Sequence, residues 1–542
     1  MNHTKLADLL YPNVTRTPDD MRTLYPPRNL PEGAMVTRHS PSPTGFVHLG
    51  NLYQSLICER LAHQSRGVFF LRIEDTDQKR KVEGATEAII DGLAYYGVNF
   101  DEGDNFGGSY GPYTQSERVD IYHVYAKWLV QQGLAYTCFC SEDTLEAIRN
   151  EQMANKEPDI GYHGKWTNCR DLSLDQVGEN LATKTPWVLR FRVTDYSATS
   201  FKHTDLVKGD VNITPNKIDH VLLKSDGIPT YHMARSIDDQ LMGVTHTIRG
   251  DEWLATFPFH LQLDRALGFR TQKFMHFGAL QKMDCDSKRK LSKRHDPELA
   301  LSYYREVGYP VQSVREYMMT ILNSNYEDWR RANPPAALEE FPFSAKKITP
   351  AGCLFDLAKL MDVSKNVVAA MSAEAVYAEY IEWAREFDAE MCALMEADPD
   401  YARRIFAIGR GGAKPRKDIG VWTDVRPYVA LFYDELFTRE AELPPQFAPE
   451  LAQSVLARYL KVMDLTLAQE DWFEQLKSVA VQFGFAPDPK TYKAEPEAYP
   501  GHVGDVAALL RIAVTGRTNS PDLREVMVLL GEDKVRARIA NK

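Results

Sequence analysis

The sequence predicts an α/β protein with a parallel sheet split by an insertion and followed by all-helical C-terminal domains. The first observation is a set of short apolar segments, each followed by a turn and a helical pattern, which is typical of parallel strands joined by crossover helices. The second is a long interruption of this alternation, from about residue 110 to about residue 210. The third is the fading of strand signals after about residue 345. The predicted strands are Met35–Arg38, Phe69–Ile73, His220–Leu223 and Thr245–Ile248.

The segment before the first strand and the interruption have their own patterns. Residues 1–34 contain five prolines and little periodicity, so we expect an extension draped on a domain, with a disordered leader as the alternative. In the interruption we expect helices around Val119–Gly133 and Leu145–Met153 and a strand over Trp187–Val193. We therefore interpret it as a domain inserted between two halves of one sheet.

The C-terminal part has helical periodicity. Apolar residues recur three or four apart from Tyr380 to Met395 and again from Leu451 to Leu460, which predicts a helix over each range. Gly409–Gly420, rich in glycine and basic residues, is expected to be a linker.

Composition excludes several classes of protein. A chain of 542 residues is too long for one compact core, and a prior of roughly three to five domains follows. No apolar stretch approaches the ~20 residues of a membrane-spanning helix, and the N-terminus matches neither a secretory nor a transit signal. The net charge of -11 argues against indiscriminate adhesion to polyanions but leaves a local basic groove possible. Seven scattered cysteines predict reduced thiols, so we expect a cytoplasmic protein without a membrane partner.

The most informative segment runs from Arg38 through the Pro/Gly-rich run to Gly45 and on to His48-Leu-Gly50-Asn51. Apolar residues at helical spacing follow, so a helix should begin near His48 with its free amides at the carboxyl edge of the sheet. Nucleotides bind at such edges, and a helix N-terminus favours phosphate. Gly50 would let a flat base lie on the backbone. The alternative for His48 alone is an ordinary, partly buried histidine.

A second motif, Lys290-Leu-Ser-Lys293-Arg294, is expected on a loop after an apolar segment, Phe274–Leu280. Its cations, with the Ser292 hydroxyl, could hold a triphosphate and neutralise the charge that builds on it during transfer. A solvated basic loop is the alternative for this run alone. Both motifs in this order, each at the edge of a sheet half, favour the functional interpretation.

With these two motifs the sequence resembles the class I aminoacyl-tRNA synthetases, because HLGN stands where that family has HIGH and KLSKR where it has KMSKS. More narrowly it resembles a bacterial-type glutamyl-tRNA synthetase. The resemblance is dense from about residue 36 to 310 and returns near the C-terminus, so it spans most of the chain. Its supporting matches are SPSPTG before the first motif, Arg72-Ile-Glu-Asp-Thr-Asp77, Thr230-Tyr-His-Met-Ala234 with Asp238-Asp239, Leu241-Met-Gly-Val-Thr-His246, Ile248-Arg-Gly-Asp-Glu-Trp-Leu254, Leu510-Arg-Ile-Ala-Val-Thr-Gly516 and Leu529-Leu-Gly531.

The resemblance implies the activity: ligation of L-glutamate to the 3′ end of tRNA(Glu) through a glutamyl-adenylate, with ATP as substrate and Mg²⁺ sharing the phosphate charge. It also implies the site. The catalytic residues would be His48, Gly50, Lys290 and Lys293; the glutamate-binding residues Arg38, Ser40, Glu74, Tyr231 and Arg249; and the ATP-binding residues His48, Gly50, Glu252 and Lys293. A guanidinium suits a carboxylate, and the acidic Glu74 would face the α-ammonium group. For Glu74, Asp75 and Asp77 the alternative is a capped turn with solvated acids.

The resemblance also implies a split Rossmann-type catalytic domain with an inserted acceptor-binding domain and all-α C-terminal domains. Monomer is the family expectation. The expected segments are 1–34, the N-terminal extension; 35–110, the first catalytic half; 111–210, the insertion that binds the acceptor stem; 211–285, the second catalytic half; 286–345, the KLSKR loop and stem-contact region; and 346–440 and 441–542, two helical anticodon-binding modules.

A zinc site is a further implication. Cys138, Cys140 and Cys169 resemble the zinc-binding version of the family's insertion, and thiolates in that number suit tetrahedral Zn²⁺. Asp171 stands where a histidine ligand can occur, so Tyr162, or the adjacent His163, would supply the fourth ligand. The alternative is three reduced, partly buried thiols.

Several functions stay open beside the glutamyl enzyme. A glutaminyl enzyme is disfavoured because glutaminyl relatives usually carry PEPNG-like and DDTNP-like segments where this chain has PSPTG and Glu74-Asp-Thr-Asp77. A non-discriminating glutamyl enzyme stays open. A catalytically silent tRNA-binding paralogue is disfavoured because His48, Gly50, Lys290 and Lys293 are all present, and a small-molecule nucleotidyltransferase because it leaves the insertion and the helical C-terminal part without a role. Stacking on single-stranded bases needs aromatic or arginine planes. The dense basic cluster that could supply them, with a solvated linker as its alternative, comprises Arg403, Arg404, Arg410, Lys414, Arg416 and Lys417.

Overall fold

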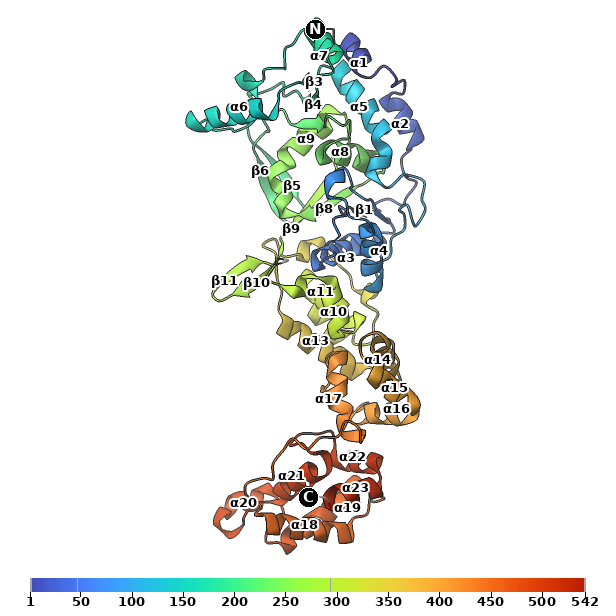
Figure 1. The fold of residues 1–542 in the computed structure, drawn as a ribbon, viewed down its shortest axis with the longest axis vertical. Coiled ribbons are helices and arrows are strands. Elements are labelled where there is room, and N and C mark those ends of the chain that lie inside the picture. Colours follow the sequence, from blue (N-terminus) through green and yellow to red (C-terminus); the bar gives the residue numbers. More distant parts are fainter. Residues whose placement is uncertain (1, 46, 293, 541–542) are drawn as a thin grey trace. The chain divides into compact units, whose positions relative to one another are not determined.

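The computed structural model describes residues 2–45, 47–292 and 294–540. Two compact units make up the chain, one from Met1–Tyr303 with Arg315–Asp356 and the other from Tyr304–Val314 with Leu357–Lys542 (Figure 1). Each unit has a hydrophobic core of its own. The finer division into seven segments stays a prediction. Among the described residues, no helix is long and apolar enough to cross a membrane.

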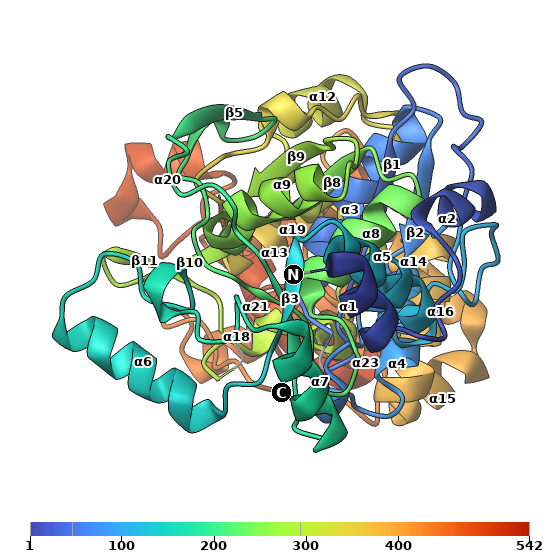
Figure 2. The ribbon, with the colours of Figure 1, turned by 90° about the horizontal axis from the view of Figure 1, so that it is seen from above.

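The first unit contains the predicted parallel sheet in two halves. Strand β1 (Val36–His39) pairs in parallel with β2 (Val68–Leu71), and β8 (His246–Gly250) pairs in parallel with β9 (Lys273–Phe277). The halves meet where the Thr245 amide donates to the Val36 carbonyl at 3.0 Å. Helix α3 (Leu49–Gln64) joins β1 to β2, and α9 (Phe257–Ala266) joins β8 to β9. In Figure 2 the helices α3, α8 (Tyr231–Leu241) and α9 lie around β1, β8 and β9.

The strands of this sheet are buried along almost their whole length, as expected of a parallel sheet covered on both faces. The carboxyl ends of β1 and β8 therefore lie at one edge, where β1 gives way to the loop before α3 and β8 to a short 3₁₀ helix, Asp251–Thr256.

One predicted strand belongs elsewhere. His220–Leu223 was expected in the parallel sheet, but β7 (Val221–Leu223) pairs antiparallel with β4 (Val188–Phe191), which in turn pairs with β3 (Ala135–Cys138). A run of three apolar residues carries no information about its partner, so this part of the prediction was wrong. The insertion also contains α5 (Val119–Gln131), α6 (Glu142–Ala154), α7 (Leu174–Ala182) and the hairpin of β5 (Phe201–Asp205) and β6 (Gly209–Ile213).

The N-terminal extension is ordered and packs on the first unit. It forms α1 (His3–Leu10) and α2 (Pro18–Leu24), with α2 started by a Thr17 capping box. Leu6, Tyr11 and Met21 are buried in the core that also contains α5, which lies beside both helices in Figure 1.

Arg28 fixes the end of this extension. Its Nη1 and Nη2 donate to the two Glu102 carboxylate oxygens, each at 2.7 Å, and its Nε donates to the Met242 carbonyl at 2.8 Å. Its guanidinium lies 3.9 Å from the centroid of the Tyr110 ring. Residues 2–34 therefore contribute two helices and buried side chains to the first unit, as an extension draped on a domain would, and the boundary at residue 34 stays a prediction.

A hairpin leads into the second motif, whose first residue, Lys290, ends its second strand. Strand β10 (Leu280–Asp284) pairs antiparallel with β11 (Ser287–Lys290) and in parallel with β12 (Cys353–Leu354). The remaining helices named up to residue 332 are α4 (Ala85–Tyr95), α10 (Leu301–Val307), α11 (Val311–Leu322) and α12 (Tyr326–Ala332).

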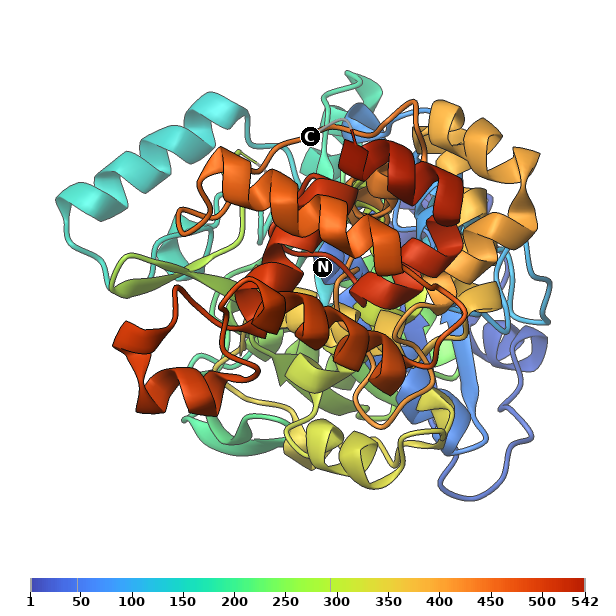
Figure 3. The same cartoon turned by 90° about the horizontal axis from the view of Figure 1, so that it is seen from below.

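In the second unit, the regular elements from residue 357 onward are helices joined by loops, with one isolated β-bridge between Ala486 and His502 among the described residues (Figure 3, orange to red). The single helix expected over 380–395 is two helices, because Asp388 ends one and its side chain caps the next by accepting from the Met391 amide. The linker at 409–420 contains no helix or strand, as predicted. The helices are α13 (Leu357–Ala370), α14 (Ala373–Phe387), α15 (Ala389–Ala397), α16 (Pro399–Ala407), α17 (Val425–Val429), α18 (Pro449–Val462), α19 (Gln469–Gln482), α20 (Pro489–Ala494), α21 (Val503–Thr515), α22 (Leu523–Leu530) and α23 (Glu532–Ala540).

Candidate active site

The helix start expected near His48 is present. His48 is the N-cap of α3, and its backbone amide donates to the Asn51 side-chain oxygen at 3.0 Å. Gly50 is required by the local geometry, since a Cβ there would lie 2.8 Å from His48 Nδ1. The imidazole thus folds over the first turn of a 16-residue helix, whose free amides favour an anion.

A cavity of about 440 Å³ opens at this edge of the sheet. It has the volume of a small-molecule site, and its wall combines apolar groups with a few convergent polar ones. Lys293 lies outside the described residues. The other predicted glutamate, ATP and catalytic residues all line the cavity: Arg38, Ser40, His48, Gly50, Glu74, Tyr231, Arg249, Glu252 and Lys290.

One wall rests on a buried ionic network around Asp239. Its carboxylate accepts from Arg38 Nε at 2.7 Å, Arg72 Nη1 at 2.8 Å and Arg235 Nε at 3.0 Å. Burial alone would raise the pKa of Asp239, but the three guanidiniums outweigh it and hold the pKa well below its usual range. Arg72 also donates to Glu74 at 2.9 Å, so one cation anchors the acidic residue of the predicted pocket.

Arg249 lies on another wall and is held differently. Its Nε donates to His276 Nε2 and its Nη1 to His260 Nδ1, each at 3.0 Å. Its Nη2 is buried and has no hydrogen-bond partner among the described residues. Burial lowers the pKa of this guanidinium to about 10, with Tyr231 opposing part of the lowering, so the group is still a cation at neutral pH.

Aromatic and acidic groups after β8 complete this side. The Tyr231 and Trp253 rings are in contact, with centroids 4.3 Å apart and planes inclined by 31°. The Glu252 carboxylate lies directly over Gly250, where a Cβ would come within 2.2 Å of Glu252 Oε2. A glycine at 250 therefore lets the chain turn the carboxylate back toward the cavity that both residues line.

The second motif is positioned by Asp296. Its carboxylate accepts two hydrogen bonds from Arg289, at 2.6 and 2.8 Å, and one from the Ser292 amide at 2.9 Å. Lys290 ends β11 and Ser292 follows on the loop, so the motif begins on a strand and not wholly on a loop as expected. Both residues line the cavity, and the Ser292 hydroxyl is buried.

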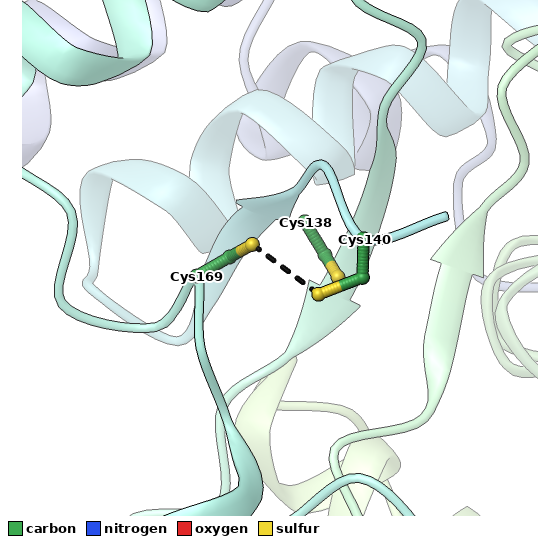
Figure 4. A group of neighbouring side chains, drawn as sticks. All are labelled: Cys138, Cys140 and Cys169. Carbon is green, nitrogen blue, oxygen red and sulfur yellow. Dashed lines mark hydrogen bonds between the residues drawn. The ribbon is translucent and has the colours of Figure 1, made fainter. Parts of the chain in front are cut away.

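Three cysteines of the insertion gather as the sequence suggested (Figure 4). The sulfur atoms of Cys138, Cys140 and Cys169 lie within 4.8 Å of one another, and Cys140 Sγ is 3.6 Å from Cys169 Sγ. The Tyr162 hydroxyl lies 3.3 Å from Cys140 Sγ. His163, by contrast, has its Nε2 on the Asp159 carbonyl at 2.9 Å.

Similar proteins agree on one family. A profile for the catalytic domain of class I tRNA synthetases (E and Q) matches residues 34–328. A glutamate–tRNA ligase of Acetivibrio thermocellus is 47% identical over 99% of each chain, and one of Sorangium cellulosum is 49% identical over 97% of each. The chain belongs to the glutamate–tRNA ligase family of class I aminoacyl-tRNA synthetases.

A solved structure agrees with this assignment. The crystal structure of a glutamate tRNA ligase from Elizabethkingia meningosepticum in complex with its amino acid superposes with a TM-score of 0.76 at 27% identity, over 94% of this chain and 98% of that one. A profile described as an anticodon binding domain matches residues 498–542. The predicted fold class, with a split α/β catalytic domain and helical C-terminal domains, is thereby confirmed.

Three of the six residues in the basic cluster proposed for base stacking form contacts within the second unit. Arg403 pairs with Asp400 at 2.9 Å, and Arg416 pairs with Asp418. Arg410 donates to backbone carbonyl oxygens, including that of Phe406. The ion pairs of Arg403 and Arg416 lie at partly exposed positions, where such pairs are weak, so contact of the whole cluster with RNA stays a prediction.

Sequence reasoning missed several residues of the cavity wall. Gln54 lines it one helical turn after Gly50, and its amide donates to the Ile248 carbonyl at 2.9 Å. Helical spacing from Gly50 could have revealed it. Sequence reasoning also missed His260 and His276, which contact Arg249 without lining the cavity; they carried no local signal, because this contact is made across the fold.

Proposed function

We propose that this enzyme ligates L-glutamate to the 3′ end of tRNA(Glu) through a glutamyl-adenylate. The observation that carries the proposal is the cavity itself. It brings together a helix N-terminus, a lysine of the KLSKR motif and a buried arginine without a carboxylate partner among the described residues. An ATP molecule and a dicarboxylic amino acid need these groups, and the family catalyses their reaction.

Glutamate presents one ammonium and two carboxylate groups. We assign the ammonium to Glu74, whose carboxylate lines the cavity and is anchored by Arg72. Arg249 suits a carboxylate, because its buried Nη2 has a donor to offer. Arg38, Ser40 and Tyr231 complete the pocket in this assignment.

ATP would lie against the start of α3, with its phosphates toward the second motif. Gly50 allows close approach to the backbone, His48 and Glu252 flank it, and Lys290 would contact the phosphates, with Lys293 assigned from the sequence alone. The nucleotide enters as its Mg²⁺ complex, since this ion binds mainly through phosphate oxygens and water.

The chemistry requires alignment and charge stabilisation and no protein nucleophile. An α-carboxylate oxygen of glutamate attacks the α-phosphorus in line, and pyrophosphate leaves with the electrons of the broken P–O bond. The terminal ribose hydroxyl of the tRNA then attacks the adenylate carbonyl carbon: the ester bond forms, the carbonyl carbon–phosphate oxygen bond breaks, AMP leaves with that electron pair, and water takes up the hydroxyl proton. The cations of the cavity would stabilise the charge that builds on the phosphates.

The cysteine cluster supports a structural zinc site. Three thiolates and one further ligand form a closed tetrahedral set, and such sites stabilise a fold. Cys138, Cys140, Cys169 and Tyr162 would hold the ion, since the Tyr162 hydroxyl points at the sulfur atoms and His163 is engaged elsewhere. The zinc would tie the end of β3 to the segment around residue 169.

The further assignments follow from the family. We assign tRNA(Glu) as the RNA partner, monomer as the working state and the cytoplasm as the location. The anticodon would be read by the helical region that includes the matched residues 498–542. The two modules at 346–440 and 441–542 are part of this proposal.

Exchange of pyrophosphate into ATP tests the proposal. It should require glutamate together with tRNA(Glu), a dependence expected from the family, and glutamine should not replace glutamate. Exchange supported by glutamine with tRNA(Gln) would indicate a glutaminyl enzyme. No exchange with either amino acid would favour a silent tRNA-binding paralogue, and exchange that needs neither tRNA nor amino acid would overturn the proposal.

A further inference from the structure

The buried arginines around the cavity fall into two kinds. Arg38, Arg72 and Arg235 each donate to the Asp239 carboxylate, so each has a buried counter-ion. Arg249 is just as buried, with 3% of its surface exposed, but no carboxylate contacts it among the described residues. A buried cation without a counter-ion is costly, so this exception requires a reason.

The partners of Arg249 are two imidazoles. His276 accepts from its Nε and His260 from its Nη1, each at 3.0 Å. These two contacts fix the orientation of the guanidinium plane. Its Nη2 has no hydrogen-bond partner among the described residues, and Arg249 lines the cavity. The guanidinium is therefore oriented by neutral groups and keeps its full charge.

The tautomers of both histidines follow from this arrangement. A guanidinium can only donate, so His276 Nε2 and His260 Nδ1 must each present a lone pair. The proton of His276 is then on Nδ1, 2.8 Å from the Asp205 carboxylate. The proton of His260 is on Nε2, 2.8 Å from His232 Nδ1.

The surroundings maintain both neutral forms. Burial, together with the nearby Arg249 and Arg235, lowers the pKa of His260 well below its usual range. Burial also lowers the pKa of His276. Asp205 lies behind the imidazole of His276, where it also accepts from the amides of Val207 and Lys208 at 2.9 and 2.8 Å. Asp205 therefore fixes the tautomer of His276, and Arg249 contacts the imidazole and not the Asp205 carboxylate.

We propose that His260 and His276 are positioning residues that hold Arg249 without neutralising it, and so reserve its charge for the substrate carboxylate. This inference rests on the proposed role of Arg249 in glutamate binding. A carboxylate in place of either imidazole would orient the arginine equally well but would compete with the substrate. A free positive charge also distinguishes a carboxylate from a carboxamide, so these histidines support the choice of glutamate over glutamine.

Two variants of nearly equal size test the charge alone. His260→Asn keeps an oxygen acceptor near the Nδ1 position, whereas His260→Asp adds one negative charge there. We expect the KM for glutamate to be at least about 30-fold higher in His260→Asp than in His260→Asn, with the KM for ATP alike in the two. The thermal midpoint of His260→Asp should equal or exceed that of His260→Asn, because the aspartate supplies the counter-ion that Arg249 lacks.

If His260 has only a structural role, the added charge should not change the KM for glutamate, and the buried aspartate should lower the stability. Equal glutamate KM values in the two variants would overturn the inference, and so would an aspartate variant that is less stable than the asparagine variant or does not fold. His276→Gln and His276→Glu make the same comparison from the other side of the guanidinium and must give the same order.

Arg249→Gln separates this inference from the assignment on which it depends. If its glutamate KM equals that of the unmodified enzyme, the role of Arg249 in the proposed function is wrong. If Arg249→Gln raises this KM at least about 30-fold while His260→Asp and His260→Asn remain equal, only the inference about the histidines is wrong.

Discussion

Replacing Asp239 with asparagine removes the one charge that three buried arginines share. The carboxylate is fully buried and accepts from Arg38, Arg72 and Arg235 at 2.7 to 3.0 Å. An asparagine of the same shape keeps one acceptor oxygen and turns an NH₂ group toward a guanidinium. Breaking a buried ion pair on one side costs about 3–5 kcal/mol, so we expect Asp239→Asn to lower the free energy of unfolding by about that amount.

The pH dependence gives this prediction a sign. The pKa of Asp239 is held below that of an unfolded aspartate, so its contribution is complete above about pH 4 and is lost only in stronger acid. The difference between Asp239→Asn and the unmodified enzyme should therefore be constant from pH 6 to pH 8. Because Arg38 lines the cavity and Arg72 anchors Glu74, the KM for glutamate should rise as well.

Urea denaturation followed by circular dichroism measures the stability term, and steady-state charging measures the KM. Asp328→Asn is the matched control, since Asp328 forms an ion pair with Arg331 in which both side chains are more than three-quarters exposed. This control should change stability by less than about 0.5 kcal/mol. An Asp239→Asn enzyme within about 1 kcal/mol of the unmodified protein, with an unchanged glutamate KM, would refute the reasoning.

Three further predictions concern the insertion, the N-terminal extension and acid stability. Metal analysis of chelator-free protein should find about one zinc per chain in the unmodified protein and less than about 0.2 in Cys140→Ser. The control Cys285→Ser, which changes an exposed thiol outside the cluster, should bind as much zinc as the unmodified protein. Less than about 0.2 zinc per chain in the unmodified protein would rule the site out. Arg28→Ala removes the two hydrogen bonds to Glu102 and the contact with the Tyr110 ring, so the free energy of unfolding measured in urea should fall by about 2–4 kcal/mol while kcat is nearly unchanged. A fall below about 0.5 kcal/mol would show that this contact of the extension contributes little to stability. Burial lowers the pKa values of His220, His232 and His246 to about 4 and that of His39 to about 3, so these imidazoles are neutral when folded and unfolding between pH 6 and pH 4.5 should take up several protons. Stability should therefore fall as the pH drops from 7 to 5, and a stability independent of pH over this range would contradict the assignment.

Local signals allowed much of the fold to be predicted. The start of α3 was found because a Pro/Gly turn precedes His48 and helical spacing follows it. The parallel strands β1, β2 and β8 were found because short apolar segments alternate with helical patterns, and the apolar segment Phe274–Leu280 overlaps β9 although it was not assigned to the sheet. These features depend on neighbours in the sequence, which a single chain displays.

The errors have a common physical cause. His220–Leu223 is a strand, as predicted, but its hydrogen-bond partners lie in the insertion, and pairing across the fold leaves no local trace. The break at Asp388 was missed because the apolar spacing continues through it: one residue ends α14 and begins α15. Both α14 and α15 bury apolar residues on either side of Asp388, so the apolar pattern does not reveal the break between them.

The candidate site shows the same division. Residues within motifs, such as Glu252 and Lys290, were predicted and do line one cavity. The network that holds them could not be predicted, because Asp239 joins three arginines from β1, the end of β2 and its own helix. His260 and His276, which contact Arg249, could not be predicted for the same reason.

Charging of purified tRNA(Glu) and tRNA(Gln) with labelled glutamate and glutamine tests the central claim most directly. The account predicts ester-linked glutamate on tRNA(Glu), with glutamine not accepted on either tRNA. Glutamate on tRNA(Gln) in addition would identify a non-discriminating enzyme and would leave the carboxylate-selecting site intact. Efficient charging of tRNA(Gln) with glutamine, or no charging at all by folded enzyme, would contradict the account.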